Sequence, residues 1–233
     1  MGYNIAIDGP AGAGKSTIAK LVAKELGFIY VDTGAMYRGL AVHFLKKGIV
    51  PGEVEKIEAA CEDAKVELGY ENGVQQVYLN GENITSQLRE EAVGNMASVS
   101  SVVPEVRKKL VELQQKLARE TDVVMDGRDI GTVVLPDADV KVYLTASVET
   151  RAKRRFLELQ EKGESADLAK IAADIEDRDY RDMHRELSPL KQAEDAILLD
   201  TSALNFEEVM REMEKLVEAA KKKQKNPIAV GNF

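Results

Sequence analysis

A glycine-rich run near the start of the chain combines a lysine and a hydroxyl in an order suited to binding phosphate. Gly9, Gly14, Lys15 and Ser16 fit the pattern G-x-x-x-x-G-K-[ST]. Glycines let the backbone curl so that N–H groups point at phosphate oxygens, while the lysine reaches the outer phosphates and the hydroxyl can bind Mg²⁺. The pattern predicts a loop that holds a nucleoside triphosphate. Its expected cofactor-binding residues are Gly9, Pro10, Ala11, Gly12, Ala13, Gly14, Lys15, Ser16 and Thr17.

The segments on both sides of this loop agree with the prediction. Residues 3–8 form an apolar run typical of a short buried strand, and Ile18, Val22 and Leu26 follow at helical spacing before Gly27 ends the helix. The loop would then open onto a helix N-terminus, whose free N–H groups and dipole attract anions. The alternative, a glycine-rich turn that binds nothing, is disfavoured because both flanks have the required pattern.

Two more apolar runs end in a carboxylate followed by polar residues. Residues 28–32 end at Asp32, after which Thr33 and Arg38 begin a helical segment. In parallel α/β sheets, ligands bind beyond the carboxyl ends of the strands. Thr33 and Arg38 are therefore expected to bind a second anionic ligand, and a helix cap beside a solvated arginine is an equal alternative on local evidence.

The second run, 121–126, ends at Asp126 and leads into Arg128 and Asp129. An arginine and two carboxylates at the tip of a central strand are not typical core residues. Asp126 is expected to order the water shell of Mg²⁺ near Ser16. The alternative is a cap or an ion pair between Asp126 and Arg128.

Arginine is concentrated in one part of the chain. Six of the twelve arginines lie between Arg151 and Arg185, whereas only three lysines do. Because the planar guanidinium suits bidentate phosphate contacts, this bias predicts a phosphate-facing segment. Arg151, Arg154 and Arg155 share one predicted helix, and Arg178, Arg181, Asp182 and Arg185 share one face of another. The alternative is internal pairing, from Asp174 to Arg178 and from Asp177 to Arg181.

Composition limits the class of protein. The chain has 233 residues, a net charge of -8 and one cysteine, Cys61, so no intrachain disulfide can form. Cys61 lies in a helical pattern and is expected to be a buried structural thiol. The negative charge argues against binding to a nucleic acid polymer. Because we see no signal peptide and no apolar run near twenty residues, we expect a cytoplasmic protein that does not bind a membrane.

Apolar strand patterns alternate with helical patterns along the chain. Strands are expected at 3–8, 28–32, 121–126, 140–145 and 196–200, and helices from 33 through 45 and at 53–64, 92–101, 106–119 and 205–220. This alternation predicts a mostly parallel sheet covered on both faces. Two strands at 66–70 and 76–79, joined across Asn72-Gly73, predict a small β insert. Residues 221–233 are expected to be frayed or disordered.

Four motifs taken together resemble the bacterial-type cytidylate kinase family. They are Gly9-Pro10-Ala11-Gly12-Ala13-Gly14-Lys15-Ser16, Asp32-Thr33-Gly34-Ala35-Met36-Tyr37-Arg38, Asp126-Gly127-Arg128-Asp129-Ile130-Gly131-Thr132 and Arg178-Asp179-Tyr180-Arg181-Asp182. The resemblance extends from residue 5 to about residue 216. It implies an α/β P-loop kinase fold with a five-stranded parallel sheet flanked by helices, a small β insert and a helical lid.

The resemblance also implies a division of the chain. A P-loop kinase domain would cover 1–220 and a flexible tail 221–233. Within the domain, the core would comprise 1–62, 102–150 and 186–220, the monophosphate-binding β insert about 63–101, and the lid with its arginine-rich helices about 151–185. We expect the protein to be a monomer.

The implied reaction is direct in-line phosphoryl transfer from ATP to CMP or dCMP, giving ADP and CDP or dCDP, with Mg²⁺. The implied catalytic residues are Lys15, Asp126, Arg128 and Arg178, and the implied metal-binding residues are Ser16 and Asp126. The implied substrate-binding residues are Thr33, Tyr37, Arg38, Ser98, Arg107, Arg128, Asp129, Arg178, Asp182 and Arg185.

By family analogy these substrate-binding residues divide by the part of the nucleotide they meet. Arg38 and Arg128 would hold the CMP phosphate. Ser98, Arg107 and Asp129 would read the cytosine edge, and Asp182, with Arg178 and Arg185, would reach the pentose.

The acceptor phosphate is already anionic near neutral pH, so the reaction needs no general base. This agrees with His43 and His184, neither of which lies in an acid–base constellation. Other readings are a kinase of UMP, AMP or shikimate, a regulatory P-loop NTPase, or an inert binding module. The regulatory class is disfavoured because the chain lacks an Asn-Lys-x-Asp motif.

Overall fold

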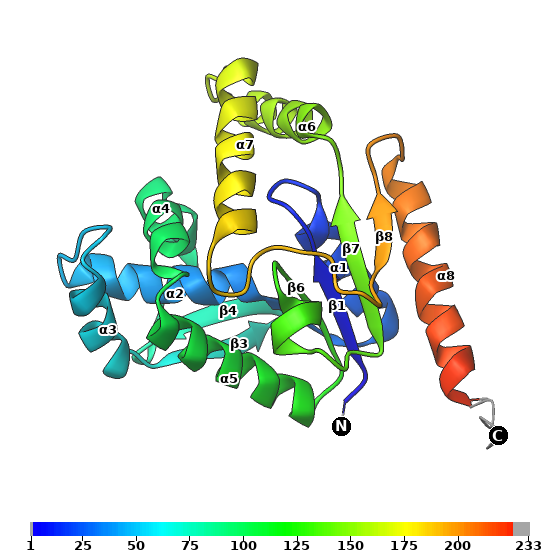
Figure 1. The fold of residues 1–233 in the computed structure, drawn as a ribbon, viewed down its shortest axis with the longest axis horizontal. Coiled ribbons are helices and arrows are strands. Elements are labelled where there is room, and N and C mark those ends of the chain that lie inside the picture. The colour runs from blue at the N-terminus through cyan, green and yellow to red at the C-terminus, as the bar shows by residue number, and fades with distance from the viewer. Residues whose placement is uncertain (1, 226–233) are drawn as a thin grey trace.

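The computed structural model of the chain describes residues 2–225, with a five-stranded parallel sheet at its centre (Figure 1). The strands are β1 Asn4–Asp8, β2 Ile29–Asp32, β6 Val123–Gly127, β7 Val140–Thr145 and β8 Ile197–Asp200. They lie in the order β2-β6-β1-β7-β8, and each neighbouring pair is parallel. The predicted parallel sheet is confirmed, and each predicted strand is present to within two residues at either end.

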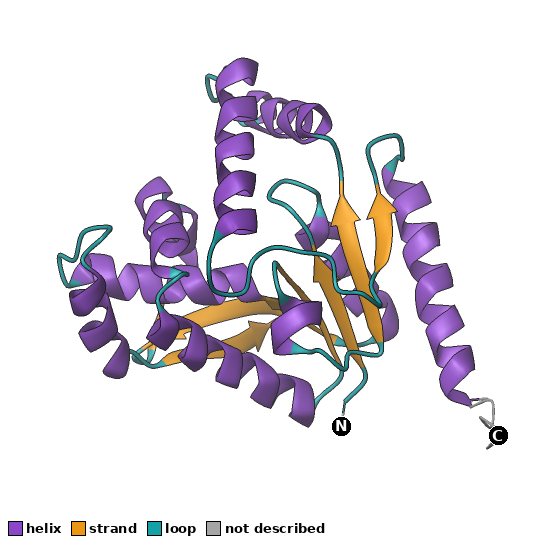
Figure 2. Cartoon of the chain, in the orientation of Figure 1, coloured by secondary structure: helices purple, strands orange, loops and turns teal. Residues whose placement is uncertain are grey.

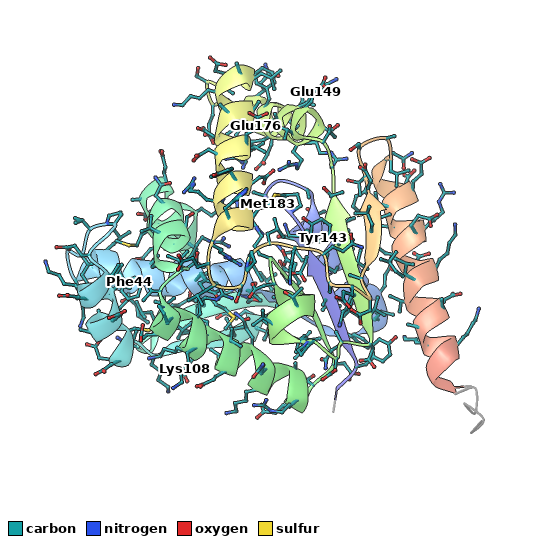
Figure 3. The ribbon with its side chains drawn as sticks, viewed as in Figure 1. Phe44, Lys108, Tyr143, Glu149, Glu176 and Met183 are labelled. Carbon is teal, nitrogen blue, oxygen red and sulfur yellow. The ribbon has the colours of Figure 1, made fainter. Side chains whose placement is uncertain are left out.

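Helices cover both faces of this sheet. They are α1 Lys15–Leu26, α2 Thr33–Lys46, α3 Val54–Glu62, α4 Glu91–Ser100, α5 Pro104–Glu120, α6 Val148–Glu161, α7 Leu168–His184 and α8 Phe206–Lys225, with a short 3-10 helix η1 Thr85–Arg89 and a π-helical turn η2 Ile130–Val134. Within β6, Met125 packs in the layer of α2 and α5, and Val124 packs in the layer of α1 and α8. This alternation follows from the two-residue period of a strand. Phe44 of α2, labelled in Figure 3, is fully buried in the first layer.

A second sheet is antiparallel and lies against the edge strand β2 of the first, without joining it (Figure 2). It comprises β3 Val66–Glu71, β4 Val74–Leu79 and β5 Glu82–Asn83. Asn72 and Gly73 both have positive φ, 52° and 76°, as a tight hairpin turn requires. The predicted β insert is confirmed.

Helices α6 and α7 project beyond the carboxyl ends of β1 and β7 (Figure 1). In Figure 3, Glu149 on α6 and Glu176 on α7 mark this projecting pair, and Met183 marks the end of α7 that approaches the strand tips. The arginine-rich segment is therefore above the edge of the sheet where ligands are expected.

One prediction at the C-terminus is wrong. Helix α8 continues to Lys225, five residues beyond the expected end at residue 220. The Lys221 ammonium lies 5.8 Å from the centre of the Tyr3 ring and 5.6 Å from that of Phe28, and Lys222 pairs with Glu218 at 3.7 Å. These contacts extend the helix through a segment that the run of lysines made look frayed. The rest of the predicted tail, 226–233, lies outside the described residues.

No helix in the part of the chain that the structure describes is both long and apolar enough to cross a bilayer.

Candidate active site

The glycine-rich loop connects β1 to α1 as predicted. Gly9 lies against β7, where a Cβ atom would overlap the carbonyl oxygen of Leu144, so the backbone can approach this strand only with glycine. Gly14 has φ 91° and precedes α1, whose first turn has no side-chain cap. The loop therefore leads directly into an uncapped helix N-terminus, the arrangement that binds phosphate groups.

Lys15 is buried at the start of α1, and its Nζ donates to the carbonyl oxygen of Pro10 at 2.7 Å. Burial, reinforced by repulsion from Arg128, lowers the pKa of Lys15 to about 7. The Lys15 ammonium group is thus held against the glycine-rich loop by a neutral carbonyl oxygen. A nearby anion would favour its charged form.

Asp126 lies at the end of β6 and is bound by two hydroxyl groups. Ser16 Oγ donates to Asp126 Oδ2 at 2.9 Å and Tyr30 Oη donates to Oδ1 at 2.8 Å. Burial, with the charge of Asp32, raises the pKa of this carboxyl. The alternative of an ion pair with Arg128 is wrong, because Arg128 Nε donates to Asp182 at 2.8 Å instead.

The Ser16 and Asp126 side chains fit a magnesium site. Mg²⁺ is usually bound through one or two protein oxygens together with substrate phosphates and water. A hydroxyl and a carboxylate in hydrogen-bond contact, beside the phosphate loop, supply such oxygens. The described residues contain no group of three or more His, Cys, Asp or Glu side chains that could hold a metal alone. The fit therefore depends on phosphate oxygens from a substrate.

Asp32 and Arg38 form an ion pair on the first turns of α2. Asp32 Oδ1 caps the helix by accepting from the Ala35 N–H at 2.8 Å, and Oδ2 accepts from Arg38 Nη2 at 3.1 Å. Thr33 Oγ1 donates to the Asp126 carbonyl oxygen at 2.7 Å, which ties α2 to β6. The capping alternative is thus correct for Asp32, but Arg38 lines the cavity described below and is not simply solvated.

Asp129 is buried between two arginines. Its Oδ2 accepts from Arg107 of α5, and its Oδ1 accepts from Arg185 at 3.4 Å. Arg107 also lies over the ring of Tyr37, 5.8 Å from its centre. Burial raises the pKa of Tyr37 to about 12. One carboxylate therefore joins α5 to the end of α7.

The two arginines of α7, Arg178 and Arg181, differ in their surroundings. Burial, together with the charge of Arg128, lowers the pKa of Arg178. Arg181 is more exposed and bonds to Ser98 Oγ of α4 at 3.2 Å and to Asp177 at 3.0 Å. The predicted pairing of Asp177 with Arg181 is thus present. Arg178 instead faces other cations across the cavity, an arrangement that an anionic ligand would relieve.

These side chains line one cavity of about 280 Å³. All four predicted catalytic residues and all ten predicted substrate-binding residues contribute to its wall. Of the predicted loop residues, Ala11, Gly12, Lys15 and Ser16 also line it. Gly9, Pro10, Ala13, Gly14 and Thr17 belong to the loop and the first turn of α1 but are not part of this wall.

The arginines of α6 do not face the cavity, so the prediction of one phosphate-facing segment is wrong for this helix. Arg151 is buried and donates to the Ala11 carbonyl oxygen at 2.9 Å and to Asp179 at 2.6 Å. Arg154 bonds to Thr201 and Arg155 to Glu158. The inner face of α6 packs on the phosphate loop and on α7, so its arginines serve contacts between elements.

Sequence reasoning missed Asp8 and Tyr30. Asp8 Oδ1 accepts from the Ile130 N–H at 2.8 Å, and Oδ2 accepts from the Gly131 N–H at 2.7 Å. Burial raises the pKa of Asp8 to about 6, although both N–H groups oppose this shift. A signal was present, since Asp8 ends an apolar strand just as Asp32 and Asp126 do.

The remaining predictions concern residues outside the cavity. Cys61 is buried, as expected. His43 is buried with Nε2 3.1 Å from Asp63, and the His184 ring stacks on Tyr180. Neither histidine lines the cavity, which agrees with a packing role.

A parallel sheet, a phosphate loop at its carboxyl edge and an arginine-lined cavity define the P-loop class of phosphotransferases. The family model described as Cytidylate kinase matches residues 5–221. The cytidylate kinase of Caldicellulosiruptor saccharolyticus is 52% identical over 90% of this chain and 93% of its own length. That of Lactobacillus johnsonii is 50% identical over 95% of each chain. The chain therefore belongs to the cytidylate kinase family of nucleoside monophosphate kinases.

A solved structure of an uncharacterized protein from Eubacterium ventriosum also resembles the chain. It has a TM-score of 0.51 and 12% identity, and it covers 93% of this chain and 99% of that chain. At this identity the similarity concerns the fold alone.

Proposed function

We propose that this kinase transfers the γ-phosphoryl group of ATP to CMP or dCMP, giving ADP and CDP or dCDP. The observation that carries the proposal is one cavity in which Lys15 and Ser16 face Arg38, Arg128 and Arg178. Two phosphate-bearing ligands can meet there, one on the backbone loop and one among guanidinium groups.

On the donor side, the loop and the N-terminus of α1 bind the phosphates of ATP, and Lys15 neutralises the outer ones. The negative charge of the phosphates raises the pKa of Lys15 and so offsets the lowering by burial in the free protein. Ser16 and Asp126 would hold Mg²⁺ together with the phosphate oxygens. When bound, the ion neutralises charge on the transferring group and helps to orient it.

On the acceptor side, Arg38 and Arg128 bind the CMP phosphate, and Arg178 joins them from α7. Burial and the charge of Arg128 disfavour the charged form of Arg178 in the free protein, so an anionic phosphate beside it is favoured. Ser98, Arg107 and Asp129 bind the cytosine edge. Asp182, with Arg178 and Arg185, reaches the pentose, where a carboxylate can accept from sugar hydroxyls.

Catalysis is by positioning and charge stabilisation. The acceptor phosphate oxygen is already a nucleophile, so no side chain has to remove a proton from it. The lysine and the arginines stabilise charge spread over the moving phosphoryl group, and arginine contacts of this kind are worth ~10³ or more in rate. The α6–α7 pair excludes water, which prevents hydrolysis of ATP.

The proposed parts of the kinase occupy different segments of the chain. Residues 63–101 form the monophosphate-binding insert, residues 151–185 form the lid, and the rest of 1–220 forms the core. The enzyme acts on small molecules as a cytoplasmic monomer and binds neither a nucleic acid polymer nor a membrane.

A panel of acceptors tests the proposal. Initial rates with Mg-ATP are measured for CMP, dCMP, UMP, AMP and shikimate, and ADP release without an acceptor gives the hydrolysis rate. We expect CMP and dCMP to have the highest kcat/KM, with hydrolysis at least ~10²-fold slower than transfer. Higher kcat/KM for UMP, AMP or shikimate, or hydrolysis as fast as transfer, would overturn the proposed substrate.

A further inference from the structure

Strand β2 is at the edge of the parallel sheet, and the β insert covers its outer side. Among the strands that the structure describes, β2 pairs only with β6, so the backbone groups that face away from β6 need other partners. Gln75 of β4 supplies two of them, because its Oε1 accepts from the Asp32 N–H at 2.9 Å and its Nε2 donates to the Asp32 carbonyl oxygen at 3.3 Å. The side-chain amide therefore pairs with β2 in place of a neighbouring strand.

Tyr70 of β3 makes a third contact with the same edge. Its hydroxyl donates to the carbonyl oxygen of Tyr30 at 3.1 Å. Residues 30 and 32 are two apart along β2, so their backbone groups face the same side of the strand. The insert is thus anchored at alternate positions of the strand that ends at the cavity.

The two anchored residues are the ones that orient groups in the cavity. Asp32 accepts from Arg38 at 3.1 Å and caps α2, while the Tyr30 hydroxyl donates to Asp126 at 2.8 Å. The side chains of Asp32 and Arg38 are 26% and 30% exposed, so neither is fully enclosed by packing. If the Asp32 backbone were mobile, its carboxylate would move, and the guanidinium of Arg38 that bonds to it would be less well positioned.

We infer that Gln75 is a positioning residue for the acceptor phosphate, acting through Asp32 on Arg38. The inference rests on the proposed function, in which Arg38 binds that phosphate. It gives the β insert a specific task in the reaction, because a residue that never meets the substrate sets the geometry of one that does. Gln75 is absent from the wall of the cavity.

The chain provides a matched control at the next position. Gln76 is also half-buried on β4, but its side chain contacts only the insert, at the Val74 carbonyl oxygen and at Asn83. Replacing either glutamine by methionine keeps the length of the side chain and removes its amide. Only Gln75→Met removes bonds to β2.

Steady-state kinetics of Gln75→Met and Gln76→Met, each with CMP and with ATP varied, test the inference. We expect Gln75→Met to raise KM for CMP about fivefold, the ratio that corresponds to one lost neutral hydrogen bond, with KM for ATP unchanged. Gln76→Met should match the wild type in both. Equal values of KM for CMP in the two variants would overturn the inference, as would an equal rise of both KM values in Gln75→Met.

A double-mutant cycle with Arg38→Ala tests whether Gln75 acts through Arg38. In the Arg38→Ala background, Gln75→Met should have no further effect on KM for CMP, because the group it positions is gone. A further fivefold rise would show that Gln75 acts elsewhere. Thermal unfolding is measured for each variant to check that it folds. If Gln75→Met does not fold, the kinetics are measured on Gln75→Asn, whose amide is one methylene shorter.

The outcomes separate this inference from the proposed function. Wild-type protein that does not phosphorylate CMP overturns both the proposed substrate and the inference. Wild-type activity on CMP with no difference between Gln75→Met and Gln76→Met overturns the role of Gln75 alone.

Discussion

The donor and acceptor sides of the cavity are built in different ways. The proposed donor side is a continuous loop and the first turn of one helix, residues 9–17, where backbone N–H groups would bind phosphate. The acceptor side draws single side chains from α2, α4, α5 and α7 and from the segment after β6. A backbone site tolerates many side-chain changes, whereas a site made of separate side chains depends on how each one is held.

The two sides also differ in how their charges are balanced. Lys15 and Asp126 bond to neutral groups, a carbonyl oxygen and two hydroxyls. On the acceptor side, Asp129 is shared between Arg107 and Arg185, and Arg128 pairs with Asp182. Removing one member of a buried charge pair leaves the other uncompensated. Substitution of one acceptor-side residue should therefore also disturb the residues with which it is paired.

The largest effect expected is on the donor side, where one side chain supplies the charge that the backbone cannot. Lys15→Ala should lower kcat by ~10³ or more, because the developing charge on the phosphoryl group loses its fixed cation. Stability should change little or increase, since a buried ammonium is removed. Coupled assays and thermal unfolding check both points.

Lys24→Ala on the exposed face of the same helix is the control, and it should keep wild-type kcat. A loss of kcat of less than tenfold in Lys15→Ala would mean that this ammonium is not the main stabiliser of charge on the phosphoryl group.

On the acceptor side, Asp129→Asn should lower kcat/KM for CMP by ~10²-fold, because two buried guanidinium groups lose the carboxylate that they share. KM for ATP should change much less. The exposed Asp137→Asn is the control for loss of one negative charge. If KM rises equally for CMP and ATP, Asp129 does not act on the acceptor side alone.

The same contrast explains how much could be predicted from the sequence. The phosphate loop, the strands and the carboxylates at strand ends are local patterns, and all of them were found in the structure. Arg38 and Asp129 were expected in the site, but their pairing with Asp32 and with Arg107 and Arg185 was not predicted. The Gln75–Asp32 contact joins residues 43 apart and the Arg151–Asp179 pair residues 28 apart. No periodicity in a single sequence specifies such pairs, since they depend on how the helices and the insert pack.

The arginines of α6 and α7 illustrate this limit. Both helices carry arginines at helical spacing, so composition predicts the same role for both. In the structure, the inner face of α6 packs against the loop through Arg151, while α7 presents Arg178 and Arg185 to the cavity. Which helix faces the ligand is decided by tertiary packing.

Asp8 provides the test with the smallest expected effect, because it lies where the two sides meet. It precedes the phosphate loop and accepts from Ile130 and Gly131, directly after Asp129. Burial raises its pKa from 3.8 to about 6. The folded state therefore binds more protons than the unfolded state between these values, so stability should fall as pH rises through this window and level off above it.

Urea unfolding of the wild type and of Asp8→Asn at pH 4, 5, 6 and 7 measures this contribution. Asn has only one acceptor oxygen, so Asp8→Asn loses one of the two N–H bonds that Asp8 accepts. This loss changes the free energy of unfolding by an amount that does not vary with pH. The wild-type value minus the Asp8→Asn value should fall by on the order of 2 kcal/mol between pH 4 and pH 6. The exposed Asp137→Asn should show no such change. A difference that stays constant or rises would mean that Asp8 is held as a carboxylate by its two N–H partners, and that the junction of the two sides carries a permanent negative charge.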